Sequence, residues 1–161
     1  MIKLEFTHRI NTSNLTRVTN LQIHWTILVN YLLKNGQKIK VTYWPGDLEI
    51  SDGYSSFGIK ALEKLIESKR LLETLDMEEI ICPINNDTID IVLSGSIKAN
   101  ENFVGAITKW FMLGILNEKG ETVFYTGDFG SDILITVFDS DITYLSEQGL
   151  DTNLLIKQPE S

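Results

Sequence analysis

Apolar and polar positions alternate with a period of two in two early stretches of this chain. Residues 1–7 place Ile, Leu and Phe at every second position, and residues 38–43 repeat the pattern with Ile, Val and Tyr. Successive side chains of a strand point to opposite faces of its sheet, so this period predicts strands with one buried face. Both stretches are therefore predicted to be half-buried strands.

A different period, of three and four residues, runs from Leu15 to Leu33. Such spacing gathers apolar side chains along one side of a helix. The first part of the stretch is rich in Thr and Asn, which form helices poorly, so the pattern predicts a helix most firmly over residues 21–34. We expect three large apolar residues on this helix to be core residues: Trp25, Leu28 and Leu32.

The middle of the chain predicts a second helix and two further strands. Apolar positions from Ile59 to Leu75 recur at helical spacing, with Lys and Glu at pairing distances between them. Residues 79–84 and 88–94 are rich in β-branched and other apolar residues, and Asn-Asn-Asp between them is typical of a turn. Because Pro83 cannot donate a ladder hydrogen bond, the first of these strands should lie at a sheet edge or end early.

The stretch from Lys109 to Asp139 carries the most regular pattern in the sequence. Its apolar runs end at short clusters of Asn, Gly, Asp and Ser, which indicates antiparallel strands joined by tight turns. Gly120 closes the first turn, where a positive φ angle is cheap. We expect residues 113–116 to pair with residues 122–125, and residues 133–137 to join the same sheet. A helix over residues 102–116 is the rival interpretation, because apolar residues there also recur at helical spacing.

Together these elements predict one α+β domain spanning residues 1–161. Its sheet should be mostly antiparallel, with a C-terminal meander, and two main helices should cover it. A short third helix is predicted over residues 142–148, preceded by an Asp-Ser-Asp capping cluster and ended by Gly149.

Composition narrows the class of protein. Hydrophobic residues make up 43% and charged residues 22% of the chain, which is ordinary globular usage. No apolar run approaches the roughly 20 residues that span a bilayer, and residues 1–10 lack the apolar segment of a secretory signal. The single cysteine, Cys82, fits a reducing compartment. We therefore expect a soluble, cytoplasmic protein without a membrane partner.

Acidic residues are concentrated in the last quarter of the chain. Residues 1–120 hold 13 Lys and Arg against 14 Asp and Glu, a balance of −1, whereas residues 121–161 hold 1 against 8, a balance of −7. Such a field repels nucleic-acid phosphate and attracts cationic surfaces, although acidic residues also serve simply to keep a surface soluble. The partner-binding residues that we predict on this basis are Glu121, Asp128, Asp132, Asp139 and Asp141.

No motif in the sequence supports a particular catalytic chemistry. The loop Gly53–Gly58, GYSSFG, lacks the second glycine of a hydrolase nucleophile elbow, and the Asp-Phe-Gly at residues 128–130 stands without other kinase motifs. One Cys and two His cannot supply a closed zinc site. We predict no catalytic residue, no metal site and no cofactor.

The acidic C-terminal quarter favours a protein-binding module over an enzyme. An immunity-type antagonist of a basic protein, such as a nuclease or another nucleic-acid-binding protein, needs an acidic surface because its target is built to hold phosphate. Nucleic acid itself is not an expected partner. Two other classes stay open: a small enzyme whose site is built from loops, and a structural or homo-oligomeric subunit.

Overall fold

The computed structural model describes residues 2–5, 15–46, 54–94, 108–130 and 132–157. Its centre is one eight-stranded sheet in the order β3-β4-β2-β5-β6-β7-β1-β8, and each pair of neighbours is antiparallel. The strands are β1 (Ile2–Glu5), β2 (Lys38–Tyr43), β3 (Ser68–Leu72), β4 (Met77–Pro83), β5 (Met112–Leu116), β6 (Thr122–Gly127), β7 (Asp132–Val137) and β8 (Ile156–Lys157).

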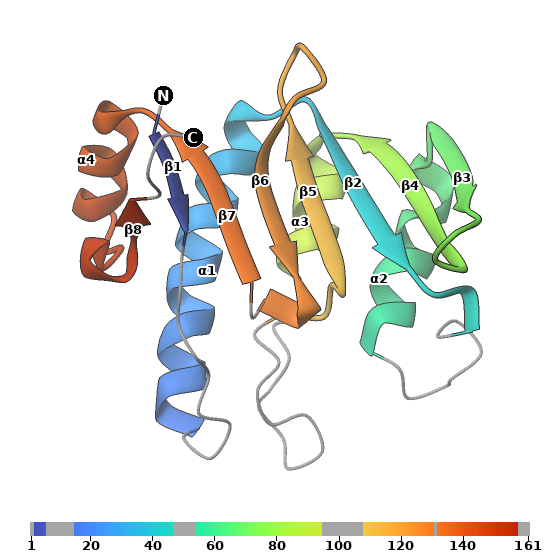
Figure 1. The fold of residues 1–161 in the computed structure, drawn as a ribbon, viewed down its shortest axis with the longest axis horizontal. Coiled ribbons are helices and arrows are strands. Elements are labelled where there is room, and N and C mark those ends of the chain that lie inside the picture. Colours follow the sequence, from blue (N-terminus) through green and yellow to red (C-terminus); the bar gives the residue numbers. More distant parts are fainter. Residues whose placement is uncertain (1, 6–14, 47–53, 95–107, 131, 158–161) are drawn as a thin grey trace.

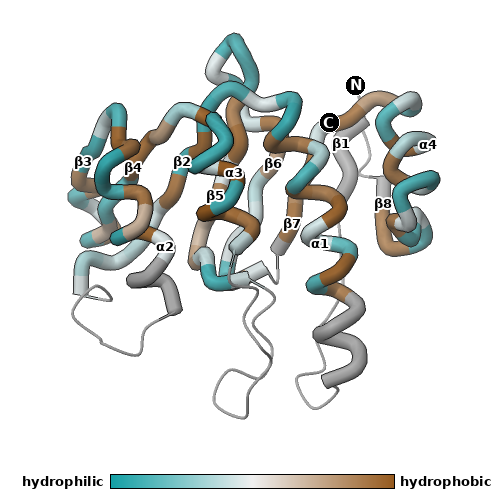
Figure 2. The backbone as a smooth tube through the Cα atoms, turned by 180° about the vertical axis from the view of Figure 1, so that it is seen from behind, coloured by the Kyte–Doolittle hydropathy of each residue, from teal (hydrophilic) through white to brown (hydrophobic). Residues whose placement is uncertain are grey.

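Helices cover one face of this sheet. Figure 1 shows them behind the strands, and Figure 2 shows the same helices from their own side. They are α1 (Leu15–Asn35), α2 (Tyr54–Leu62) and α3 (Asn86–Leu93), while α4 (Asp139–Glu147) lies at the β8 end of the sheet. The predicted α+β fold with a mainly antiparallel sheet is confirmed. In the described part of the chain, no helix is long and apolar enough to cross a membrane.

The core lies between the helices and the sheet. Trp25, Leu28 and Leu32 of α1 are buried as predicted, with 5% or less of each residue exposed. They belong to one apolar cluster with Ile39 and Val41 of β2, which confirms the buried face of that strand. Burial of apolar surface on one side of each element holds the two layers together.

The central hairpin is also confirmed. In β5 and β6, Leu113 lies opposite Thr126 and Ile115 opposite Phe124, and β7 continues the meander beside β6. Gly120 has a φ of 77°, the positive value that the turn was expected to need. The rival helix is wrong over the described residues 108–116, because residues 112–116 form β5.

The first helix is longer than the region predicted most firmly. It begins at Leu15 and runs without interruption to Asn35. Once a helix has formed, each residue added to its end gains a backbone hydrogen bond without a new nucleation step. The weak propensities of Thr and Asn in residues 16–20 are therefore overridden.

The predicted helix from Ile59 to Leu75 is wrong beyond its first part. The helix α2 ends at Leu62, a short 3₁₀ turn η2 (Glu63–Leu65) follows, and residues 68–72 form β3. Pairing with β4 decides this outcome, because it supplies ladder hydrogen bonds and places Lys69 and Arg70 against carboxylates of β4. Of the Lys and Glu residues at helical spacing, only Lys69 lies on a strand, and it contacts Glu78 of β4 and not Glu73.

The predicted strand over residues 88–94 is also wrong, because these residues form α3 and its C-terminal cap. The side chain of Asn85 caps this helix by accepting a hydrogen bond from the Thr88 N–H at 2.9 Å. The Thr88 hydroxyl donates to the Pro83 carbonyl at 2.7 Å. Pro83 does end β4, as expected, although β4 lies inside the sheet between β3 and β2.

A C-terminal helix is present as predicted, but it begins earlier, so the expected Asp-Ser-Asp capping cluster forms its first turn and Phe138 is the N-cap residue. It spans Asp139–Glu147, and Gly149 beyond it has a φ of 97°, which suits the end of a helix. A short return strand that the pattern suggests at residues 48–51 lies outside the described residues.

Candidate partner-binding surface

The structure places the five predicted acidic residues at opposite ends of the strands β6 and β7. Asp128 follows β6 and Asp132 begins β7, and the pairing of Gly127 with Asp132 holds these positions together. Glu121 precedes β6 and the remaining two residues lie on α4, all beyond the other end of these strands. A strand of six residues, such as β7, is about 20 Å long, so the five carboxylates do not form one cluster.

Asp141 holds α4 in place. One of its carboxylate oxygens accepts a hydrogen bond from the Phe138 N–H at 2.7 Å, which satisfies a free donor at the start of the helix. The other oxygen accepts a hydrogen bond from the Tyr31 hydroxyl of α1. This bond, together with burial, raises the pKa of Tyr31 to about 12. Asp141 is thus a structural residue that joins α4 to α1.

Further contacts fix the orientation of α4. Leu145 and Leu150 are buried beneath it, and the ring of Tyr144 lies 5.1 Å from that of Tyr31. After the helix, the Asp151 N–H donates to Nδ1 of His24 at 3.3 Å. With its inner side held in this way, α4 presents its remaining side chains outward.

The outward side of this segment combines aromatic and acidic residues. Phe138 is 62% and Tyr144 45% exposed. Three carboxylate residues, Asp139, Glu147 and Asp151, are exposed beside them. Residues 120–156 contain no Lys or Arg, so the sequence around α4 carries no cation to neutralise them. We call these five residues the α4 surface.

The other two described acidic positions lie in tight turns. Glu121 accepts a hydrogen bond from the Asn117 side chain at 2.9 Å, which closes the β5–β6 turn. Asp128 is exposed and begins a run of three residues with positive φ, the others being Phe129 and Gly130. The side chain of Asp132 lies outside the described part of the structure.

An aromatic cluster adjoins Asp128. The rings of Trp44 and Phe111 lie 4.2 Å apart, and those of Phe111 and Phe129 5.4 Å apart. The Phe129 carbonyl accepts a hydrogen bond from the Thr108 N–H at 3.0 Å, which anchors the unusual turn. Because the rings pack on one another, the cluster stabilises this end of the sheet.

Lys109 is a buried cation that the sequence analysis did not single out. Its ammonium donates to the carbonyls of Ile91 and Ser94, at 2.9 and 2.7 Å, and lies 5.0 Å from the Trp110 ring. These carbonyls stand at the C-terminal end of α3, which favours positive charge. Burial lowers the pKa of Lys109 to about 8. The only signal in the sequence is one Lys beside an apolar run.

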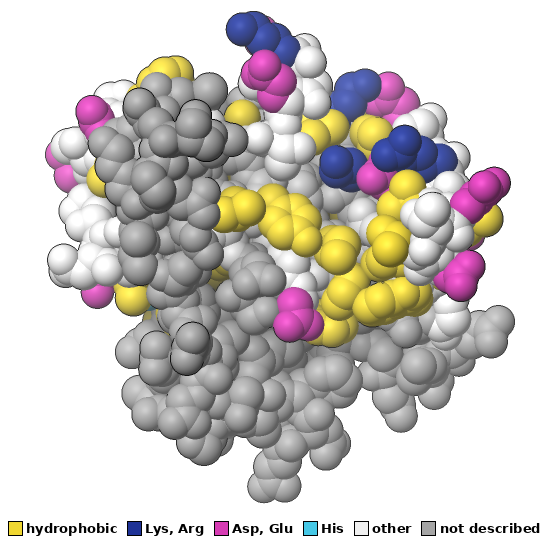
Figure 3. All heavy atoms as spheres, viewed as in Figure 1, with side chains coloured by type: hydrophobic (Ala, Val, Ile, Leu, Met, Phe, Trp, Pro, Cys, Tyr) yellow, Lys and Arg dark blue, Asp and Glu magenta, His cyan; other side chains and the backbone are white. Residues whose placement is uncertain are grey.

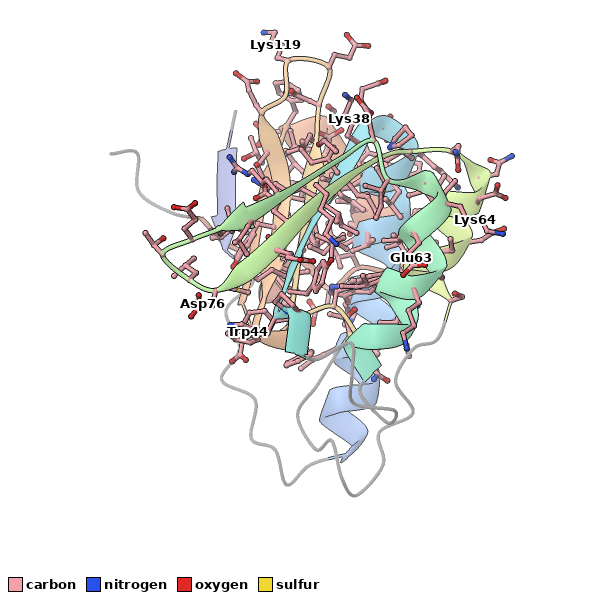
Figure 4. All side chains as sticks on the ribbon, turned by 90° about the vertical axis from the view of Figure 1, so that its right-hand side faces the viewer. Lys38, Trp44, Glu63, Lys64, Asp76 and Lys119 are labelled. Atoms are coloured by element: carbon pink, nitrogen blue, oxygen red, sulfur yellow. The ribbon has the colours of Figure 1, made fainter. Side chains whose placement is uncertain are left out.

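An open groove borders the β5–β6 turn. Its volume is about 720 Å³, and it is lined by Lys38, Glu67, Ile81, Leu116 and residues 117–120, among others. Lys38 and Lys119 mark its position in Figure 4. Lys38 contacts Glu67 at 2.6 Å. Within the described residues, no group of three or more His, Cys, Asp or Glu side chains could hold a metal ion.

Comparison with protein-family models, with curated proteins and with solved structures found no match. Figure 3 shows Lys and Arg side chains over the β2–β4 side and at the β5–β6 turn, and none among the coloured side chains at the α4 side.

Proposed function

We propose that this chain is a protein-binding module that engages a basic protein through the α4 surface. The observation that carries the proposal is the exposure of two aromatic rings and three carboxylate residues in one segment, residues 138–151, whose sequence has no Lys or Arg. The partner class is a protein with a cationic surface, such as a nuclease or another nucleic-acid-binding protein. The chain would act on it as an immunity-type antagonist.

The two kinds of side chain have separate tasks in this proposal. Exposed carboxylates raise the rate of encounter with a cationic surface and occupy positions that would otherwise hold phosphate. Aromatic residues supply most of the affinity in many interfaces, because a large ring is buried at little cost in side-chain entropy. Phe138 and Tyr144 are the anchors, and Asp139, Glu147 and Asp151 supply the field.

The proposal revises the set of predicted partner-binding residues. Asp139 stays a contact residue, whereas Asp141 positions the surface by holding α4 against α1. Asp128 and Asp132 lie at the far end of β6 and β7, so a partner centred on α4 would reach them only across the length of the sheet. We assign them no contact with this partner.

The test begins with capture of a partner from the native host's lysate at low and at high salt. A basic protein that is retained only at low salt supports the proposal, because exposed charges are screened over about 8 Å at physiological ionic strength. The recovered protein is then expressed separately, and its association with this chain is measured by surface plasmon resonance.

Two matched variants decide whether the α4 surface is responsible. Asp139→Asn with Glu147→Gln removes two charges from α4 and conserves side-chain shape. Glu63→Gln with Glu118→Gln removes two exposed charges elsewhere. We expect the α4 variant to associate several-fold more slowly, which is part of the roughly 10- to 1,000-fold acceleration that a complete steering field provides, and we expect the control to match the wild type. Equal association of the two variants would rule out the α4 surface as the binding site.

A further inference from the structure

Among the residues that the structure describes, no strand pairs with the outer edge of β3. This strand is the terminal one in the sheet order and pairs with β4 alone. Figure 1 shows it as the outermost strand at the right-hand end, and Figure 4 views the molecule from this end. Alternate residues of such a strand direct their N–H and C=O groups outward, where they can pair with another strand. At the opposite edge β8 has two residues, against five in β3.

An exposed leucine marks the uncovered side of β3. Leu71 is 59% exposed, although the register places it on the sheet face that the helices cover. Leu71 lies opposite Glu78, which lies opposite the buried Tyr43 on the next strand. On β2, two strands from β3, the same face of the sheet is therefore part of the hydrophobic core. A strand added beyond β3 would extend the face and bury Leu71.

The charged side chains of β3 do not prevent this edge from pairing with another strand. Natural edge strands often carry Lys that prevents pairing with another chain. Here Lys69 contacts Glu78 at 3.0 Å and Arg70 contacts Glu79 at 2.8 Å, so carboxylates of β4 balance both cations. Besides these two paired but exposed cations, the edge presents backbone groups and an apolar side chain to solvent.

We propose that β3 pairs antiparallel with β3 of a second copy of this chain, which joins two sheets into one around a two-fold axis. The sequence of the strand is complementary to itself in one register. With Leu71 opposite Leu71 of the second copy, Lys69 faces Glu73 of that copy, and the same pair recurs across the axis. Glu73 follows β3 directly and is exposed.

The alternative register in which the two-fold axis passes through Arg70 is disfavoured by charge. Centred on Arg70, it would set two arginines directly opposite each other, and like charges in that position are destabilising. The register centred on Leu71 instead buries two leucines at the axis and adds two cross-strand ion pairs. The Lys69 side chain is 50% exposed, and its ammonium has three donors, so it can contact Glu73 of the second copy while keeping Glu78.

The inference goes beyond the proposed function and does not depend on it. The sheet order puts β3 at one end and β8, beside α4, at the other. Pairing through β3 therefore leaves the α4 surfaces of the two copies at the outer ends of the dimer. A dimer that binds two partner molecules, or two sites on one partner, gains avidity without any new contact.

Sedimentation velocity over a series of protein concentrations tests the dimer. We expect the wild type to shift from monomer to dimer as concentration rises, because pairing of one short strand buries less than a standard interface of about 800 Å² per partner. Leu71→Lys should stay monomeric at every concentration. Leu134→Lys is the matched control: Leu134 is a 43% exposed leucine on β7, and this variant should dimerise like the wild type.

Cross-linking tests the register independently of the folding of the Lys variant. Residues opposite each other in an antiparallel pair have Cα atoms about 4.5 or 5.5 Å apart, depending on whether they exchange hydrogen bonds, and both values fall within the range of about 4.4 to 6.8 Å that a disulfide needs. Mild oxidation of Leu71→Cys should yield a disulfide-linked dimer, and Leu134→Cys should yield none. The native Cys82 is fully buried and does not compete. The proposal is overturned if the wild type is monomeric at all concentrations or if the Leu71→Lys variant still dimerises. The register is overturned if Arg70→Cys cross-links faster than Leu71→Cys.

Discussion

The two ends of the sheet use their carboxylates in different ways. At the β2–β4–β3 end, Glu78 and Glu79 of β4 contact Lys69 and Arg70 of the neighbouring β3. Glu67, which directly precedes β3, contacts Lys38 of β2. At the α4 end, Asp141 accepts hydrogen bonds from a backbone N–H and a tyrosine hydroxyl, and Asp151 accepts two from Asn153. Asp139 and Glu147 are exposed to solvent. No ion pair occurs at the α4 end among the residues that the structure describes.

The comparison shows that the role of an acidic residue depends on whether a cation lies next to it. Paired carboxylates at the β3 end contribute to the cross-strand register and have little long-range field left. Unpaired carboxylates at the α4 end keep their field, which is available to a partner and is weakened by salt. A tyrosine bonded to a carboxylate occurs at both ends, Tyr43 with Glu78 and Tyr31 with Asp141, so this feature alone does not separate a structural end from a binding one.

The largest expected effect concerns the apolar anchor of the α4 end. Leu145→Ala removes a fully buried side chain beneath α4 and should lower the free energy of unfolding by about 2 to 5 kcal/mol. Its neighbour Tyr144 is half exposed, and Tyr144→Ala should cost far less. Urea unfolding of both variants measures the difference. Similar losses would mean that α4 is held mainly by its outward contacts.

The next effect concerns the polar anchor at the same end. Asp141→Ala leaves the Phe138 N–H and the Tyr31 hydroxyl without their acceptor and should cost about 1 to 3 kcal/mol. Asp139→Ala removes an exposed carboxylate from the same helical turn and should cost less. In a double-mutant cycle with Tyr31→Phe, we expect the losses to be non-additive, because the two side chains share a hydrogen bond. Additive losses would contradict a direct contribution of that bond.

A smaller effect is expected from the ion pairs of the β3 end. Glu79→Gln weakens the contact with Arg70, whose side chain is 68% exposed, so the loss should be about 1 kcal/mol or less. Leu72, on the same strand, provides a non-ionic comparison through Leu72→Ala. Unfolding in low and in high salt distinguishes the two variants. Only the loss of unfolding free energy caused by Glu79→Gln should shrink as the salt concentration rises.

The last effect, the dependence of stability on pH, is absent at neutral pH and appears only in alkaline solution. Folding raises the pKa of Tyr31 from its ordinary value of 10 to about 12, so the stability linked to this group is complete below pH 10 and is lost as pH rises toward 12. Burial and the bond to Glu78 raise the pKa of Tyr43 in the same direction. Tyr31→Phe should reduce the loss of stability between pH 10 and 12 and leave the remaining part to Tyr43. An unchanged pH profile would show that Tyr31 titrates normally.

The acidic character of the candidate site could be predicted from the sequence, but the relative positions of its side chains could not. The excess of acidic residues after position 120 was evident, and so was the helix after Asp139. That Asp141 faces α1, whereas Asp139 faces solvent, depends on a tyrosine 110 residues earlier in the chain. Sequence spacing could not separate Asp128 from Asp139 either, because the length of β7 and its direction set their distance.

The sequence by itself determined the elements whose signals are local. The period-two strand β2, the turn at Gly120 and the apolar stripe of α1 each form through residues close together in the chain, so local rules predicted them. Tertiary structure decided residues 68–72 and 86–93, where short apolar runs fit either a helix or a strand. Residues 68–72 became β3 because β4 offered a partner in register, and residues 86–93 became α3 because Asn85 capped a helix that packs against α1 and α2. A strand obtains its hydrogen bonds from a distant segment, whereas a helix obtains them from its own residues, and sequence periodicity in a short run cannot show which source is available.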